Sequence, residues 1–564
     1  MRLQTVLILV AALLTGLPGC APRLEKADLV LTNGRIVTMD AQKPEATALA
    51  IRGDILIAVG SDEEIREYMG EGTKEIDLEG CLTIPGFIEG HAHFLGIGRA
   101  KLIVDLTGAS SWDEIVDIVK DATNNAPPGA WIIGRGWHQE KWTTVPQPNV
   151  DGLPLHHSLS EVSPKNPVYL THASGHAAIV NGLALELAGI DRFTPDPPGG
   201  QIVRDGSGEP IGVLREKAKQ LVLDVREKSW NEEETRRVIE LAADECLSKG
   251  ITSFQDAGSS FRTIDLLKKL TLMGKLPLRL WVMIEEENEV LSEHLPEYRL
   301  IGFGDRRLTV RAIKRYMDGA LGTHSAWLFE PYADLPQSRG LNTSDLESLA
   351  ETAQLAIEHG FQLCIHAIGD RANHETLNLY QEMFRRYPSE TDLRWRIEHA
   401  QHLRPDDISR FAALGVIASV QGIHCTSDGP WVIERLGERR AEEGAYVWRK
   451  LIDSGAVVIN GTDSPVEDVS PVQCFYASVS RKLKDGSVFF PSQRMSREEA
   501  LRSYTINAAF AAFEEEIKGS LAPGKLADIT VLSRDIMTIP EDEILDAKVL
   551  YTIVGGKVAY KSGE

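Results

Sequence analysis

A repeated alternation of helix and apolar strand constrains the fold of this chain more than any other feature. Three such pairs follow one another in the second half of the sequence: residues 347–359 then 361–365, 406–414 then 416–420, and 450–454 then 456–460. Helices that connect successive strands are typical of βα units, which build a parallel sheet. We therefore predict an α/β fold in which a (β/α)8 TIM-like barrel occupies residues 84–514.

Both ends of the chain show a different pattern, made of short apolar runs separated by glycine. The runs comprise residues 29–32, 48–51 and 55–60 near one end, and 527–532 and 550–554 near the other. Gly555-Gly556 then has the composition of a hairpin turn. We predict one small β-sandwich built from both termini, with residues 27–83 as its first part and 515–564 as its second.

Residues 101–226 do not fit the barrel pattern. They contain apolar runs at 131–134 and 168–171 and a Pro/Gly-rich loop at 195–200. This stretch is too long for a single connection between a strand and a helix. We expect it to form an inserted subdomain near the mouth of the barrel.

The N-terminus has the features of a targeting segment. Arg2 supplies a positive start, and the apolar run 5–17 is too short to remain as a membrane-spanning helix. The residues up to Cys20 resemble a bacterial lipoprotein cleavage box, so we predict a signal peptide over 1–19 and lipid on Cys20. The chain would then be exported and tethered to a membrane through lipid alone. The alternative is an ordinary secretory signal that happens to contain a cysteine.

The net charge argues against one class of partner, and the spacing of the cysteines argues against two kinds of structural site. A net charge of −22 argues against a nucleic-acid partner, which requires a basic surface to neutralise phosphates. The five cysteines after Cys20 are widely scattered and form no Cys-x-x-Cys pair. They therefore indicate neither a disulfide framework nor a cysteine-built zinc site.

Titratable side chains follow several of the predicted barrel strands, where barrel enzymes place their catalytic groups. These residues are His91, His93, Lys314, His366, His399 and Asp463. His91 and His93 are two positions apart on a strand, so their side chains point to the same face and can reach one metal ion. A lysine such as Lys314 at an inward strand position is unfavourable unless it is paired or modified. Each residue alone is a weak indication, but their shared position at strand ends predicts a single site.

The order of these motifs identifies a family. Pro-Gly-Phe-Ile at 85–88 precedes His91-Ala92-His93, and strand-end His, His and Asp follow. Supporting motifs lie at residues 131–137, 196–200, 318–322, 396–401 and 521–528. From about residue 27 to the end, the chain resembles the amidohydrolase superfamily, and more narrowly its YtcJ-like branch, also called amidohydrolase 3. Glu89 departs from the family, which usually has Asp at that position.

The resemblance implies a metal-dependent hydrolase that uses one or two divalent ions, with zinc as the first choice. His91 and His93 would bind one metal, and His366 and His399 would bind a second or complete the first site. Asp463 would bind metal and act as general base and acid, taking a proton from the attacking water and passing it to the leaving amine.

Lys314 sits where related enzymes carry a carboxylated lysine that bridges two metals. Carboxylation would turn the cationic amine into an anionic oxygen ligand. The alternative is an unmodified lysine paired with Asp318 or with a carboxylate of the substrate.

Several further residues are candidates for contacting the substrate. His424 would polarise the scissile carbonyl or bind substrate, and the resemblance implies that His176 contributes to the pocket. His138 is an additional candidate for substrate binding. Glu216 is either an acid of the pocket or simply a surface charge. His402 lies three residues after His399 and competes with it as a ligand, although the Glu-His-Ala-Gln motif favours His399.

The predicted activity is hydrolysis of a C–N bond in a small molecule, either a non-peptide amide or an N-acyl or N-formyl compound. Deamination or isomerisation by the same residues is the first alternative. A non-enzymatic exported binding lipoprotein is the second, although a binder has no need of the complete ligand set. The sequence leaves the oligomeric state open between a monomer and a homo-oligomer, although related enzymes are often dimers or larger.

Overall fold

The structure, a computed structural model, describes residues 25–139, 142–172, 177–197, 200–228, 231–322 and 324–563. The predicted signal peptide, Cys20 and His176 lie outside these residues. Within the described part of the chain, no helix combines the length and hydropathy that crossing a bilayer requires.

Eight parallel strands form a nearly closed TIM-like barrel, as predicted. In barrel order they are β8 (Phe87–Ala92), β17 (Ile251–Ser259), β18 (Arg279–Ile284), β20 (Leu308–Tyr316), β21 (Gln362–Ala367), β22 (Arg396–His399), β23 (Ile417–Gln421) and β24 (Val458–Gly461). The short β19 (Leu300–Gly302) pairs antiparallel with β20. Most of these strands are buried along their whole length, as strands covered on both faces must be.

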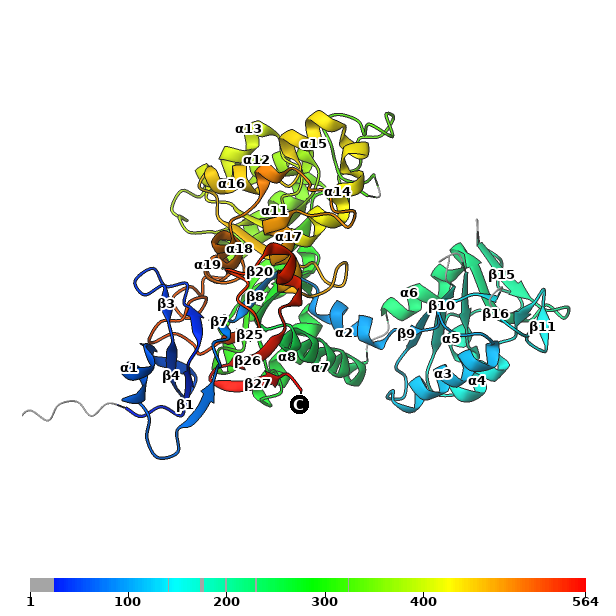
Figure 1. Cartoon of the computed structure of the whole chain (residues 1–564). Coiled ribbons are helices and arrows are strands. Elements are labelled where there is room, and N and C mark those ends of the chain that lie inside the picture. The colour runs from blue at the N-terminus through cyan, green and yellow to red at the C-terminus, as the bar shows by residue number, and fades with distance from the viewer. Residues whose placement is uncertain are drawn as a thin grey trace, which may run out of the picture.

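Helices follow the barrel strands and lie around them (Figure 1). They are α7 (Glu232–Ser248), α8 (Phe261–Leu272), α9 (Asn288–His294), α10 (Phe303–Arg306), α11 (Leu346–His359), α12 (Asp370–Arg386), α13 (Pro405–Leu414), α14 (Gly422–Leu436), α15 (Glu438–Gly444), α16 (Trp448–Asp453), α17 (Pro471–Ser480), α18 (Arg497–Ser503) and α19 (Ile506–Ala511). The three predicted helix–strand pairs are confirmed as α11–β21, α13–β23 and α16–β24. Helix α11 shows the local reasons: Asp345 caps its first turn, and Gly360 ends it in a left-handed conformation with φ 69°.

The barrel closes where β24 meets β8. The N–H of Asp463 donates to the carbonyl of His91 at 2.8 Å. The carboxylate of Glu89 accepts N–H bonds from both strands, at 3.1 Å from His91 and 2.8 Å from Thr462. Gly461 allows this approach, because a Cβ atom there would lie 2.4 Å from the backbone nitrogen of His91. The segments that carry His91 and Asp463 are therefore held together by the fold itself.

Two sheets are built from residues near both ends of the chain. One contains β5 (Ile55–Gly60), β4 (Ala48–Arg52), β1 (Leu29–Thr32) and β6 (Lys74–Asp77), with α1 (Asp62–Arg66) beside it. The other contains β27 (Lys557–Lys561), β26 (Val549–Val554), β25 (Ile529–Leu532), β7 (Leu82–Pro85), β2 (Arg35–Val37) and β3 (Glu45–Ala46). Strand β7 pairs with β25, so the two ends of the chain share a sheet, and both sheets contribute to one hydrophobic cluster.

The region predicted as an insert has its own sheet and its own cores. The sheet runs β15 (Gly200–Arg204), β16 (Pro210–Glu216), β14 (Ala177–Val180), β13 (Val168–His172), β10 (Ile132–Trp137) and β9 (Val104–Asp105). Around it lie α3 (Trp112–Asn124), α4 (His157–Val162), α5 (Gly182–Leu187) and the hairpin of β11 (Asn149–Val150) with β12 (Leu153–Pro154). Two hydrophobic clusters lie entirely within this region.

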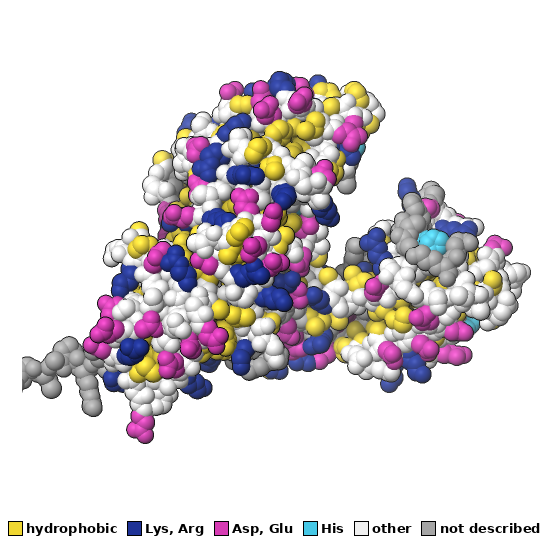
Figure 2. Space-filling model, in the orientation of Figure 1, with side chains coloured by type: hydrophobic (Ala, Val, Ile, Leu, Met, Phe, Trp, Pro, Cys, Tyr) yellow, Lys and Arg dark blue, Asp and Glu magenta, His cyan; other side chains and the backbone are white. Residues whose placement is uncertain are grey.

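The insert leaves the carboxyl end of β8 through α2 (Phe94–Leu102) and returns through α6 (Gln220–Lys228) and α7. Figure 1 shows its sheet beside the barrel, and Figure 2 shows open space between the insert and the upper part of the barrel. On the face in Figure 2, acidic and basic side chains are interspersed and do not gather into one basic patch.

Replacement of Gly461 by alanine should destabilise the barrel closure. The new Cβ would meet the backbone of His91 and the carboxylate of Glu89, at 2.4 and 2.5 Å, so β8 and β24 would have to separate. We expect the free energy of unfolding to fall by about 1–3 kcal/mol in urea titrations. Gly108→Ala is the matched control, since no atom lies within 4 Å of its Cβ position. Equal stabilities of the two variants would refute the proposed closure.

Candidate metal centre

His91, the last but one residue of β8, is fully buried, and one of its two ring nitrogens is engaged in a hydrogen bond. Its Nδ1 lies 2.5 Å from Oε2 of Glu398, on β22 at the other side of the barrel. The carboxylate therefore fixes the ring so that Nε2 faces Asp463, whose Oδ1 is 3.6 Å away. This Nε2 has no hydrogen-bond partner among the described residues. A buried ring nitrogen oriented by a carboxylate and left without a partner has the arrangement of a metal ligand.

His399 and Asp463 complete a group of three potential ligands. Nδ1 of His399 lies 2.7 Å from Oε1 of Gln421, which leaves its Nε2 for a metal. One ligand atom from each of His91, His399 and Asp463 lies within 4.8 Å of the others, and all three residues are buried. Oδ1 of Asp463 is also unpartnered in the described chain. Two imidazoles and a carboxylate suit zinc and similar divalent ions, so the residues present fit the implied metal.

His93 and His366 stand at the edge of this group. Nε2 of His93 lies 3.4 Å from Oδ1 of Asp463, and its side chain is partly exposed. The ring centroid of His366 is 4.4 Å from that of His399. Nε2 of His366 faces Oδ1 of Asp318 at 3.6 Å and the carbonyl of Gly319 at 3.5 Å, so its Nδ1 is the nitrogen left for a metal.

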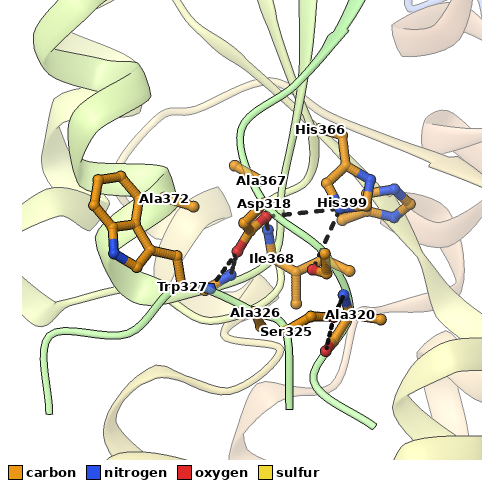
Figure 3. Close-up of polar contacts among 12 residues, drawn as sticks. Asp318, Ala320, Ser325, Ala326, Trp327, His366, Ala367, Ile368, Ala372 and His399 are labelled. Carbon is orange, nitrogen blue, oxygen red and sulfur yellow. Dashed lines mark hydrogen bonds and ion pairs between the residues drawn. The ribbon is translucent and has the colours of Figure 1, made fainter. Parts of the chain in front are cut away.

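Asp318 holds the loop after β20 against the end of β21 (Figure 3). Its carboxylate accepts N–H bonds from Trp327, Ile368 and Gly369 at 2.7–2.9 Å. The alternative in which Asp318 pairs with Lys314 is therefore wrong for this structure. Its carboxylate is already used by the backbone that supports His366, and no ion pair joins it to the lysine in the described residues.

Lys314 lies on β20 with 1% of its surface exposed, among the metal-site side chains. Its Nζ is 5.0 Å from the ring centroid of Tyr316, and no described carboxylate lies within 4.0 Å to form an ion pair with it. Burial lowers the pKa of this lysine, while the charges of Glu398 and Asp463 partly oppose that shift. A buried lysine without an ion pair favours the neutral amine.

The electrostatics of the site favour the forms that bind metal. Burial lowers the pKa of His91, brings that of His366 to about 3, and lowers that of His399 well below its ordinary value. Burial alone would raise the pKa of Asp463, but the close approach of His93 and the surrounding histidines hold it well below its usual range. Neutral imidazoles and an ionised carboxylate are the metal-binding forms of these groups.

His424 belongs to the same site, whereas His402 does not. His424 lies in the first turn of α14, is 8% exposed, and places Nε2 3.8 Å from Oδ2 of Asp463. Nε2 of His402 instead lies 3.2 Å from the side-chain nitrogen of Gln401. The structure thus places His399, and not His402, in the metal centre.

The two described candidates in the insert are not brought to the metal centre. His138 follows β10, with its ring centroid 4.7 Å from that of His172. Glu216 is exposed at the end of β16 and has a φ of 48°. Strands β10 and β16 lie apart from the barrel strands in Figure 1.

Sequence reasoning missed two buried acids of the site. The sequence shows Glu398 only as part of the Glu-His-Ala-Gln motif and does not reveal that this carboxylate orients His91. Asp256 lies on β17 and accepts hydrogen bonds from the N–H of Phe94 and the hydroxyl of Ser259, at 2.9 and 2.7 Å. Its position near the end of an apolar strand is the signal that identified the histidines, and the same criterion would have found it.

These buried imidazoles and carboxylates at the carboxyl ends of barrel strands define a metal-dependent hydrolase. The chain belongs to the amidohydrolase family: residues 74–560 match the family described as "Amidohydrolase family" (Amidohydro_3). The superfamily expected from the sequence motifs is thereby confirmed.

Three relatives are similar over nearly their whole length. Protein LONG AFTER FAR-RED 3 of Arabidopsis thaliana is 37% identical, covering 95% of this chain and 92% of the relative. YtcJ of Bacillus subtilis (strain 168), which carries an amidohydrolase name, is 32% identical, covering 94% and 98%. N-substituted formamide deformylase of Arthrobacter pascens is 29% identical, covering 95% and 98%.

A solved structure supports the same conclusion. The crystal structure of an uncharacterized metal-dependent hydrolase from Pyrococcus furiosus has a TM-score of 0.75 and 28% sequence identity to this chain. The match covers 90% of this chain and 100% of that one.

Replacement of Glu398 by glutamine should weaken metal binding by about 10–100-fold. The neutral amide holds the Nδ1 proton of His91 less strongly, so Nε2 becomes a poorer and less oriented ligand. Zinc affinity measured by competition with a chromophoric chelator tests this directly. Glu390→Gln, at an exposed position, is the control. Unchanged zinc affinity in a correctly folded Glu398→Gln protein would contradict the assigned role.

Proposed function

We propose that this protein hydrolyses a C–N bond in a small non-peptide amide, an N-acyl or an N-formyl compound, with zinc as its metal. The proposal rests on the buried group of His91, His399 and Asp463. Two potential ligand atoms of this group, Nε2 of His91 and Oδ1 of Asp463, have no hydrogen-bond partner in the described chain. Support for the bond type comes from the relative named N-substituted formamide deformylase, which matches 95% of this chain.

A divalent ion bound by these residues would supply a water of lowered pKa and polarise the carbonyl of the substrate. The two oxygens of Asp463 face different partners: Oδ1 faces His91 and His93, and Oδ2 faces His424. The pKa of Asp463 lies below its ordinary range, so the side chain is ionised at neutral pH. Its role as general base, which accepts a proton from the attacking water, rests on position, because a carboxylate among the candidate ligands lies beside that water. The same carboxyl group can then return that proton to the leaving amine.

His424 is placed to act on the substrate carbonyl. It lies across Asp463 from His91 and His93, and its Nε2 has no hydrogen-bond partner among the described residues. In the tautomer with a proton on Nε2, it can donate a hydrogen bond to the carbonyl oxygen as negative charge develops there.

Deamination or isomerisation by the same residues is the second candidate, because the barrel site activates water without selecting the leaving group. Product analysis separates the reactions. A released carboxylate together with an amine supports the proposed hydrolysis, whereas free ammonia from an aminated ring supports deamination. Tight ligand binding without any turnover would support a binding protein instead.

We further propose that the insert reads the substrate through His138, Glu216 and His176, since a unit separate from the barrel strands is free to vary with substrate. Loss of selectivity among N-acyl and N-formyl compounds in His138→Ala would support this. We also propose that the terminal sheets pack as a β-sandwich, for which their shared hydrophobic cluster is the support.

Export and a lipid anchor on Cys20 remain our proposals for location, with a homo-oligomer as the assembly. The short apolar run and the cysteine that follows it support the anchor. The intact mass of the mature protein tests it, because a mature chain that begins elsewhere and lacks lipid would contradict it. Light scattering tests the oligomer.

Asp463→Asn and His91→Asn should each reduce kcat/KM for the best formamide or N-acyl substrate by about a thousandfold or more. Asn at 463 removes the proton acceptor, and Asn at 91 removes a ligand. Circular dichroism should show an unchanged fold. Asp406→Asn, at a side chain that is 89% exposed, is the control and should retain full activity. Full activity in either site variant would refute the mechanism.

Lys314 should carry a carbamate in the metal-loaded enzyme. Carbon dioxide adds to the neutral amine and one proton leaves, which gives an anionic oxygen ligand without a buried cation. Growth or reconstitution with 13C-bicarbonate should give a carbamate carbon signal in the wild type that is absent from Lys314→Arg. An enzyme with its full complement of metal and an unmodified Lys314 would contradict this assignment.

A further inference from the structure

A carboxylate without a cationic partner lies on helix α14, beside the metal centre. Asp428 follows His424 by four residues on this helix, so the two side chains share one face, with a rise of about 6 Å between them. Nε2 of His424 is 3.8 Å from Oδ2 of Asp463. Asp428 therefore lies one helical turn beyond a residue that reaches the metal centre.

Two neutral donors hold one oxygen of Asp428. The side-chain nitrogen of Gln401 donates to Oδ2 at 3.1 Å, and the hydroxyl of Tyr446 donates to the same oxygen at 2.5 Å. The Gln401 nitrogen also lies 3.2 Å from Nε2 of His402. Burial lowers the pKa of His402 to about 3, so this neutral ring accepts through Nε2 and helps to fix the amide. The carboxylate is thus held in one orientation by the loop that follows β22 and by the segment between α15 and α16.

The other oxygen of Asp428 is free. Oδ1 accepts no hydrogen bond from a described residue, and it is not among the completely buried polar atoms, so it keeps contact with solvent. Within the described chain no basic side chain lies within 4.0 Å of this carboxylate. Arg481, which is buried near Tyr446, donates instead to the carbonyls of Phe489 and Tyr446. A partly buried carboxylate with an unused oxygen is stabilised by a cationic donor.

Glu467 adds a second negative charge to the same region. It lies in the loop after β24, four residues after Asp463, and is partly buried. Besides burial, the charge of Glu467 raises the pKa of Asp428, so the two carboxylates are close enough to repel each other. Glu467 forms no ion pair with a described residue, whereas its neighbour Asp468 pairs with Lys249 at 3.0 Å. A cation near both carboxylates would relieve this repulsion.

His424 and Trp431 flank Asp428 along α14. His424 is 8% exposed, and its Nε2 has no hydrogen-bond partner in the described chain. Trp431 is partly exposed and reaches the loop after β20, where a Cβ atom at Gly322 would lie 3.4 Å from the indole ring. The helix therefore presents, in order from the metal centre, an imidazole with an unused nitrogen, a carboxylate and an apolar ring.

We propose that Asp428 binds a cationic group of the substrate, so that the enzyme prefers N-acyl or N-formyl compounds that carry an ammonium group. The ammonium would donate to Oδ1 of Asp428 and lie near Glu467, while the scissile carbonyl lies at His424. Trp431 supplies apolar surface for the carbon chain between them. This inference rests on the proposed hydrolysis, because it names the substrate class of the same metal centre.

A purely structural role for Asp428 predicts a different result. Its contacts with Gln401 and Tyr446 support the loop that follows β22. Loss of that support would affect charged and uncharged substrates alike and would leave the ratio of their rates unchanged. Recognition of a cation changes that ratio, so the ratio is the quantity to measure.

Kinetics with matched substrate pairs test the proposal. One pair is an N-acetyl diamine and the N-acetyl alkylamine of equal length, which places the ammonium on the amine side. The other is the N-methyl amide of an ω-amino acid and that of the corresponding alkanoic acid, which places it on the acyl side. We expect the wild type to prefer the cationic member of at least one pair by about tenfold or more in kcat/KM, and Asp428→Asn to lower this preference by about tenfold or more.

Two further variants define the expected pattern. Glu467→Gln should lower the preference by a smaller factor, because Glu467 acts on the ammonium through its charge. Asp406→Asn, at a side chain that is 89% exposed, is the matched control and should keep the wild-type preference.

Binding measurements separate failure of this inference from failure of the proposed hydrolysis. If neither pair is turned over, the result counts against the hydrolysis, and isothermal titration of the metal-loaded protein with the same compounds still measures the preference for the ammonium. Equal values for charged and neutral members in the wild type, or a preference that is unchanged in Asp428→Asn, would overturn the role of Asp428. If Asp428→Asn fails to fold, a preference unchanged in Glu467→Gln would overturn the cation site.

Discussion

The hydrogen bond between His91 and Glu398 is the contact on which the metal centre depends. It crosses the barrel interior from β8 to β22, and both side chains are completely buried. Burial alone would raise the pKa of Glu398, but its interaction with His91, including the hydrogen bond, and the charge of Arg396 bring it to about 2. A buried pair of this kind is poor evidence for stability, because desolvation offsets much of its Coulomb energy. Its value lies in directing Nε2 of His91 to the point where His399 and Asp463 meet.

The backbone around the site is strained in a way that fits this geometry. His399 and Asp463 have φ values of 76° and 55°, in the left-handed region that residues other than glycine rarely adopt. Each such residue is unfavourable by about 1–3 kcal/mol and persists only where the surrounding structure enforces it. Here the closure of β24 on β8 and the pairing of β21 with β22 provide that enforcement. The strands turn sharply where their last side chains must face a common point.

The sequence predicted those features that repeat locally. Helix α11, strand β21 and the group of His91, His399 and Asp463 follow from period, capping and position at strand ends. The sequence could not predict which side chain forms the hydrogen bond to Nδ1 of each histidine. Glu398 is 307 residues from His91, and Gln421 is 22 from His399. Such pairs depend on strand register and barrel closure, which no local pattern encodes.

Polar atoms without partners have two different meanings in this molecule. Nε2 of His91 and Oδ1 of Asp463 lie 3.6 Å apart without partners in the described chain, and a shared cation can serve both of these acceptors. Nδ1 of His402 is buried without a partner among the described residues, and as a donor it needs an acceptor, which a metal ion is not. The same residue type thus calls for a cation in one place and a hydrogen-bond acceptor in the other. The difference comes from which ring nitrogen the neighbouring side chain already engages.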